Sequence, residues 1–104
     1  MADLSSTHYT KSDNSLIRID IMANGHLHNA LANLMWRDPT RVGEIEAMTA
    51  EVVKRAKAED YAAMTTPELA VRAQQMLASP WLPALQAEGL MTRIHEMLSE
   101  RGLK

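Results

Sequence analysis

The chain of 104 residues lacks cysteine, which excludes disulfide bonds, thiolate metal sites and cysteine nucleophiles. Phenylalanine is also absent and glycine occurs only four times, whereas methionine occurs eight times. Aliphatic and methionine side chains must therefore build the core, and methionine can fill irregular gaps because its side chain is unbranched and flexible. The length fits one small domain.

Long apolar runs are missing as well. The longest contain three or four residues, far short of the roughly 20 that a membrane-spanning helix needs. The first fifteen residues, MADLSSTHYTKSDNS, hold no apolar stretch like that of a signal peptide. We therefore expect a soluble, cytoplasmic protein. Residues 1–14 are expected to form a disordered N-terminal tail, followed by a single helical domain over residues 15–104.

An excess of basic charge is absent too, because 11 basic residues stand against 13 acidic ones and give a net charge of −2. This balance argues against direct binding to nucleic acid or to an acidic membrane. The one basic cluster, Lys54, Arg55 and Lys57, is followed at once by two acidic residues and suits the C-terminal end of a helix. The alternative is a small helical DNA-associated regulator that uses this cluster.

Catalytic motifs are missing from the sequence: no serine stands in a G-x-S-x-G turn and no glycine-rich phosphate loop is present. His26 and His28 are two residues apart, so they share a face on a strand but not on a helix. His95 and Glu96 resemble the start of a metalloprotease motif, but Ser99 stands where the second histidine belongs. We expect no enzyme, no metal and no cofactor; a metal or haem module at His26 and His28 ranks third among the hypotheses.

Proline and glycine divide the second half of the chain into helices. A capping residue directly before a proline favours a helix start, because the cap accepts a hydrogen bond and proline needs none in the first turn. Gly89 and Gly102 follow apolar segments and predict helix ends. The pattern predicts an all-α fold of about five helices, two long and three short. The three cap and proline pairs are Asp38-Pro39, Thr66-Pro67 and Ser79-Pro80.

The segment 16–36 is ambiguous. Apolar residues from Leu27 to Met35 have helical spacing, but residues 17–21 alternate strictly, as in a strand. Asn24-Gly25 would then provide the turn of a β-hairpin over residues 17–29. We favour one long helix capped by Ser15, because an isolated two-stranded hairpin is only marginally stable.

Two tryptophans and the nearby methionines are the most informative side chains for function. Trp is the residue type most enriched at the energetic centres of protein interfaces. Two long amphipathic helices also leave more apolar area than one small core can cover, which favours a homodimer. Both tryptophans could instead close the ends of the core. We predict a partner-binding surface that includes Met35, Trp36, Trp81, Leu82 and Met91.

The size of the chain, its Met- and Leu-rich second half and residues 23–48, ANGHLHNALANLMWRDPTRVGEIEAM, resemble the QslA-type quorum-sensing antiactivators of pseudomonads. The resemblance implies a protein without catalysis of its own that dimerises and binds the ligand-binding domain of a LuxR-type transcription factor. It implies that the bound receptor can neither dimerise nor bind its DNA site. No motif matches residue by residue, so the predicted contact residues come from the apolar side chains alone.

Overall fold

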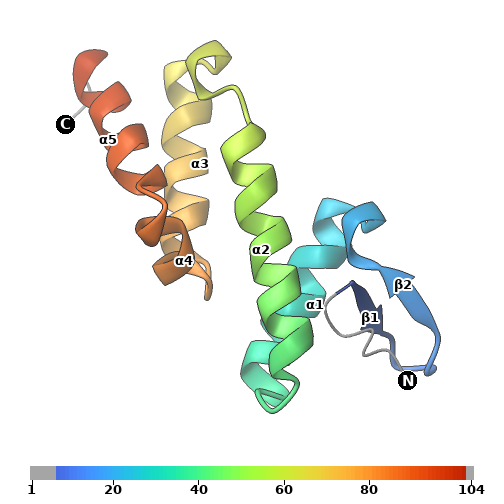
Figure 1. Ribbon diagram of the computed structural model, residues 1–104. Coiled ribbons are helices and arrows are strands. Elements are labelled where there is room, and N and C mark those ends of the chain that lie inside the picture. Colours follow the sequence, from blue (N-terminus) through green and yellow to red (C-terminus); the bar gives the residue numbers. More distant parts are fainter. Residues whose placement is uncertain (1–6, 103–104) are drawn as a thin grey trace. The chain divides into compact units, whose positions relative to one another are not determined.

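A computed structural model describes residues 7–102 of the chain (Figure 1). These residues form five α-helices and one two-stranded sheet, so the predicted all-α class is confirmed. None of the described helices combines the length and apolarity needed to cross a membrane. The elements in chain order are β1 (His8–Thr10), β2 (Leu16–Arg18), η2 (Ile19–Ile21), α1 (Asn24–Arg37), α2 (Val42–Ala58), η3 (Tyr61–Ala63), α3 (Thr66–Ala78), α4 (Leu82–Ala87) and α5 (Leu90–Glu100).

The chain divides into two compact units, which we call the N-terminal unit, up to Lys54, and the C-terminal unit, from Arg55 onward. Helix α2 runs across this boundary. The N-terminal unit contains the hairpin, α1 and most of α2, and the C-terminal unit contains α3, α4 and α5. The single domain over residues 15–104 stays a prediction.

Strands β1 and β2 form an antiparallel hairpin in which Tyr9 lies opposite Ile17. The turn begins at Lys11, whose carbonyl accepts a hydrogen bond from the Asn14 N–H, and Asn14 adopts the left-handed conformation (φ 67°). A tight turn followed by a left-handed residue is a common hairpin connection. The predicted disordered tail is therefore wrong for residues 8–14; residues 1–6 lie outside the described residues.

The long helix expected from Ser15 is wrong, because α1 begins only at Asn24. Ser15 instead closes the hairpin turn and donates hydrogen bonds from its N–H and its hydroxyl to Asp13. The alternative hairpin over residues 17–29 is also wrong in its bounds. Of its alternating segment, residues 17–21, only the first two belong to β2, which pairs backward with β1, and the other three form η2.

Asp38 was expected to cap the second long helix, but it ends α1 and its N–H donates to the carbonyl of Leu34. Helix α2 begins at Val42 and extends over 17 residues. Proline at position 39 can follow directly because Asp38 has already left the helical conformation (φ −143°, ψ 60°) and the chain turns there, with the Arg41 N–H donating to the Asp38 carbonyl. Residues 38–41 thus form a short corner between α1 and α2.

The N-cap of α3 lies one residue before the predicted cap. Thr65, not Thr66, is the N-cap: its hydroxyl accepts from the Glu68 N–H at 3.3 Å, and Glu68 accepts from the Thr65 N–H at 3.1 Å. This reciprocal capping box satisfies two N–H groups that the helix leaves without partners. Ser79 was expected to cap α4 but instead ends α3, and its hydroxyl donates to the Met76 carbonyl at 2.7 Å.

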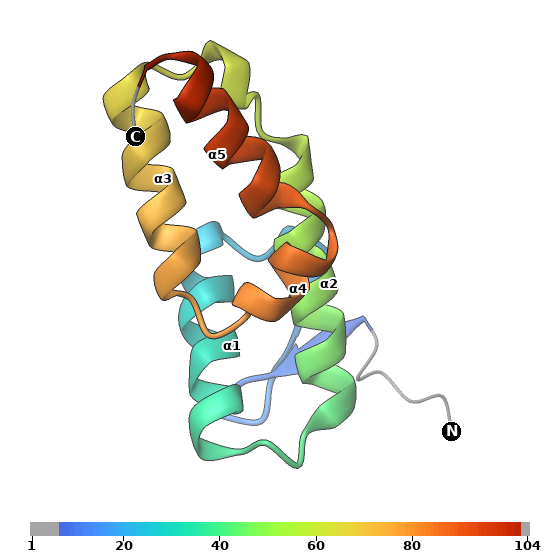
Figure 2. The ribbon, with the colours of Figure 1, turned by 90° about the vertical axis from the view of Figure 1, so that its left-hand side faces the viewer.

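Helices α3 and α5 lie side by side in opposite directions, and α4 joins them at one end, as both views show (Figure 2). Gly89 and Gly102 follow α4 and α5 with φ of 72° and 82°, so both predicted stops are confirmed. A left-handed residue is the common way to end a helix, and glycine adopts it without strain.

Each unit has its own set of buried side chains. Those of the N-terminal unit come from η2, the residue that follows it, α1 and α2: Ile19, Met22, Leu27, Ala30, Leu31, Leu34, Met48 and Val52. Those of the C-terminal unit come from every element between α2 and α5: Ala56, Tyr61, Leu69, Ala73, Met76, Leu85, Leu90, Met91, Ile94 and Leu98. No buried polar or charged residue occurs among the described residues.

Candidate interaction surface

Trp36 is the most exposed large apolar side chain of the described chain, with 85% of its surface open to solvent. It is the last residue but one of α1, where the helix ends at the corner. Leu34 faces the core two residues earlier, and a helix places residues two apart on different sides. Its position on the helix therefore directs Trp36 outward. Val42, the first residue of α2, is 54% exposed on the other side of the same corner.

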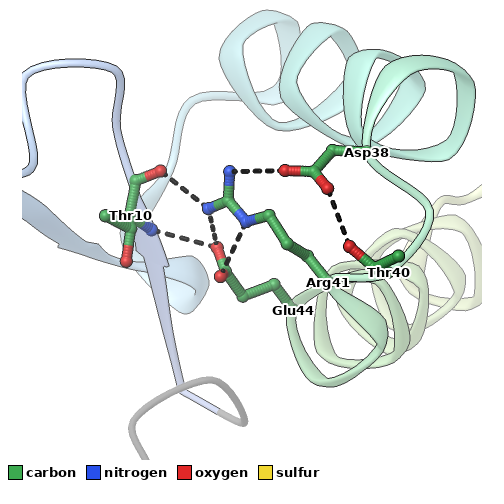
Figure 3. A network of polar contacts seen from close by, with 5 residues as sticks. All are labelled: Thr10, Asp38, Thr40, Arg41 and Glu44. Carbon is green, nitrogen blue, oxygen red and sulfur yellow. Dashed lines mark hydrogen bonds and ion pairs between the residues drawn. The ribbon is translucent and has the colours of Figure 1, made fainter.

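The corner that carries Trp36 is held by polar contacts (Figure 3). The Thr40 hydroxyl donates to Asp38 at 2.9 Å, and the Arg41 guanidinium lies 3.9 Å from the same carboxylate. These contacts fix the four residues between α1 and α2. Contacts that fix the backbone next to Trp36 reduce the conformational entropy that is lost when a partner binds there.

A second set of contacts joins this corner to the hairpin (Figure 3). Arg41 donates to the Thr10 carbonyl at 2.9 Å, and the Thr10 N–H donates to Glu44 at 3.1 Å. Arg41 and Glu44 also pair with each other through both Nε and Nη2. Hydrogen bonding to Glu44 raises the pKa of Arg41 above its ordinary value.

This arrangement closes the open edge of β1. Strand edges expose N–H and C=O groups that can pair with another strand. Here one acidic and one basic side chain satisfy both groups of Thr10, where another strand would otherwise bind. Tyr9 adds to the attachment: the Arg41 guanidinium lies 5.4 Å from its ring centre, and the His26 ring meets it edge-on at 6.1 Å. Another strand therefore cannot pair with the backbone of β1 at Thr10.

The five predicted contact residues fall into both units. Met35 is half-buried beside Trp36 on α1. Trp81 and Leu82 are half-buried at the start of α4. Met91 is 5% exposed in the C-terminal core, so it is not a surface residue and we leave it out of the candidate surface. Of the five, Trp36 alone presents most of its side chain to solvent.

The basic cluster does lie in the last turn of a helix, because Arg55 and Lys57 end α2. Lys57 pairs with Glu88 at 3.2 Å, which reduces its attraction for a phosphate. His26 and His28 lie on α1, exposed and half-buried respectively, two residues apart and hence on different sides of the helix. The described residues hold no group of three His, Asp or Glu side chains that could bind a metal ion.

Sequence reasoning missed Val42, Arg41 and Glu44. Arg41 and Glu44 are three residues apart on one helical face, which predicts an ion pair. Nothing in the local sequence shows that this pair binds the backbone of Thr10, more than thirty residues away. Comparison of the chain with protein-family models, with curated proteins and with solved structures gives no match.

Proposed function

We propose that this protein is a small non-catalytic regulator that acts by binding another protein, with Trp36 at the centre of the contact. The observation that carries the proposal is the 85% exposure of Trp36 near the end of α1, beside a corner fixed by Asp38 and Arg41. Burial of an apolar side chain of this size under a partner lowers the free energy of binding. Trp often contributes much of the binding energy of an interface. Trp81 and Leu82 are secondary candidates.

The partner that we propose is the ligand-binding domain of a LuxR-type transcription factor, and the resemblance noted in the sequence supports this choice. Such a factor binds a palindromic DNA site as a two-fold dimer. Loss of the dimer uncouples the two half-sites and removes the gain from joint binding, on the order of 10²–10⁴ in affinity. A protein that covers the dimer surface thus acts as an antiactivator without turnover. We propose that it acts in the cytoplasm and as a homodimer.

The test uses a purified LuxR-type receptor with its palindromic DNA in a mobility-shift titration. The wild-type protein should release the DNA at concentrations stoichiometric with the receptor. Trp36→Ala should require at least about tenfold more protein, because it removes the central apolar contact. Leu77→Ala is the matched control, since Leu77 is also exposed (46%) but lies on α3.

Equal inhibition by wild type and Trp36→Ala would remove Trp36 from the contact. If the receptor stays on the DNA at every concentration of the protein, the proposed antiactivator function is ruled out. Direct binding of the protein to the DNA, lost at high salt and in a variant with Lys54, Arg55 and Lys57 changed to Gln, would support the DNA-associated alternative.

A further inference from the structure

The hydrogen bonds at the two ends of the hairpin fix which backbone groups of β2 face β1. The Lys11 N–H donates to the Ser15 carbonyl at 2.8 Å, and the Ile19 N–H donates to the Thr7 carbonyl at 2.9 Å. Along an antiparallel pair, residue pairs that exchange hydrogen bonds alternate with pairs that do not. Within β2, Ile17 therefore bonds to β1, whereas its two neighbours direct their backbone groups away from β1.

These two neighbours, Leu16 and Arg18, form an outer edge of the sheet, which we call the β2 edge (Figure 1). Thr10 supports the assignment, because it lies opposite Leu16 and its own backbone bonds outward to Glu44. The Arg18 carbonyl belongs to η2, for which Arg18 is the N-cap. Three groups remain: the N–H and C=O of Leu16 and the N–H of Arg18. Among residues 7–102, no hydrogen bond engages these three groups.

The side chains at the β2 edge are apolar or paired with an opposite charge. Leu16 is 49% exposed, and Ile21, three residues beyond β2, is 65% exposed. The Arg18 guanidinium pairs with the Asp20 carboxylate at 2.6 Å, so these two charges offset each other. Leu16 and Arg18 are two residues apart on a strand and share one face of the sheet. The β2 edge therefore favours a segment with uncharged, apolar side chains on that face.

We propose that the β2 edge binds a short, extended, uncharged segment of another protein as a third strand of the sheet. The three backbone groups specify this occupant, because an extended backbone presents N–H and C=O groups on one side at every second residue, about 6.6 Å apart. The added strand pairs with β2 and not with β1, since Arg41 and Glu44 already bond to the backbone of Thr10. The proposal does not rest on the proposed regulatory function, because Trp36 takes no part in it.

The first experiment titrates the capped peptide acetyl-Thr-Val-Thr-Val-Thr-amide into the full chain and follows amide hydrogen exchange by NMR. The two valines are two residues apart, so they match the shared face of Leu16 and Arg18. Exchange of the Leu16 and Arg18 amides should slow at least about tenfold, whereas that of Ile17, already bonded to β1, should change less. The same peptide with N-methyl groups on both valines should bind at least about tenfold more weakly, because the valine N–H groups face β2.

The second experiment removes one donor of the β2 edge. Arg18 has φ −68° and ψ 131°, which proline adopts without strain, so Arg18→Pro removes the outward N–H and retains the backbone conformation. Arg18→Ala is the matched control, because it removes the same side chain and its pair with Asp20 but keeps the N–H. Arg18→Pro should bind the peptide at least about tenfold more weakly than Arg18→Ala. Unchanged amide signals of Tyr9 and Ile17 check that the hairpin is retained.

The proposal is overturned if the peptide leaves exchange at the β2 edge unchanged, if the N-methylated peptide binds equally well, or if Arg18→Pro and Arg18→Ala bind alike. Protection of the β2 edge that rises with protein concentration alone would assign it to a second copy and would also overturn the proposal. Trp36→Ala separates the two proposals, because it retains the β2 edge. Normal peptide binding by a Trp36→Ala protein that no longer inhibits a receptor supports both. Peptide binding by a wild-type protein that never inhibits a receptor supports the β2 edge alone.

Discussion

The two units of this chain differ in what they expose. Both units have contacts between distant segments: Arg41 and Glu44 contact Thr10 in the N-terminal unit, and Arg101 contacts the Met64 carbonyl in the C-terminal unit. The N-terminal unit carries four of the six exposed large apolar residues of the described chain: Leu16, Ile21, Trp36 and Val42. The C-terminal unit carries the other two, Val71 and Leu77, and its helices begin and end at local caps. The first unit therefore offers most of the apolar surface for binding.

The largest change in stability that we expect in either unit comes from the titration of Tyr61 in the C-terminal unit. Its ring is buried, its hydroxyl donates to the Ala56 carbonyl, and Glu59 lies 3.2 Å from the same hydroxyl. Burial, and then the charge of Glu59, raise the pKa of Tyr61 from 10.0 to about 12. The fold thus favours the neutral phenol, and this stability is complete below pH 10 and is lost between pH 10 and pH 12.

Urea unfolding at several alkaline pH values checks this expectation. The wild-type free energy of unfolding should fall by about 2 to 3 kcal/mol more than that of Tyr61→Phe between pH 10 and pH 12. Tyr9→Phe, in the N-terminal unit, should show the same fall in the free energy of unfolding as the wild type, because Tyr61 is still present. Parallel curves for wild type and Tyr61→Phe would show that the phenol is not protected by the fold.

A smaller effect should follow from Arg41→Gln in the N-terminal unit. The change removes the hydrogen bond to the Thr10 carbonyl and the ion pair with Glu44. We expect the free energy of unfolding to fall by about 1 to 2 kcal/mol. Amide hydrogen exchange should become faster in β1 and β2 and stay unchanged in α3 and α5. Arg18→Gln is the control, because its pair with Asp20 is exposed and should contribute within about 0.5 kcal/mol.

The smallest effect concerns the cap of α3. Thr65→Ala should cost about 1 kcal/mol, because it removes the hydroxyl that accepts from the Glu68 N–H, whereas Thr66→Ala should cost less. Hydrogen bonding to Thr65 lowers the pKa of Glu68 below 4.5. The stability from this contact is therefore present above pH 4.5 and is lost as the pH falls through the folded pKa. Thermal unfolding of the two variants at pH 7 and in acid tests both statements.

The same contrast explains what the sequence could predict. In the C-terminal unit the helix ends depend on the two or three residues beside Pro67, Gly89 and Gly102. The sequence therefore predicts the bounds of these helices to within a few residues. The hairpin was missed because its turn has no glycine and uses Asn14 in the left-handed conformation instead. Its stability also depends on Arg41 and Glu44, which local patterns cannot place.

The candidate site was predicted in part for similar reasons. Trp36 was named from its residue type, and its position after the core-facing Leu34 explains why it is exposed. The same reasoning names Met91, but Met91 lies in the core, because it is buried three residues before the buried Ile94 on the same face of α5. Apolar residue type alone does not separate a core position from a binding surface; the packing of neighbouring helices decides it.

The central claim is that Trp36 is a protein contact, and fluorine NMR of the 5-fluorotryptophan protein tests it most directly. A LuxR-type ligand-binding domain is added to this protein, and the signal that is absent from the Trp36→Ala variant identifies Trp36. The account predicts that the Trp36 signal shifts or broadens and saturates at a fixed stoichiometry, and that the Leu77→Ala protein behaves in the same way. A Trp36 signal that stays unchanged while the two proteins bind would contradict the claim.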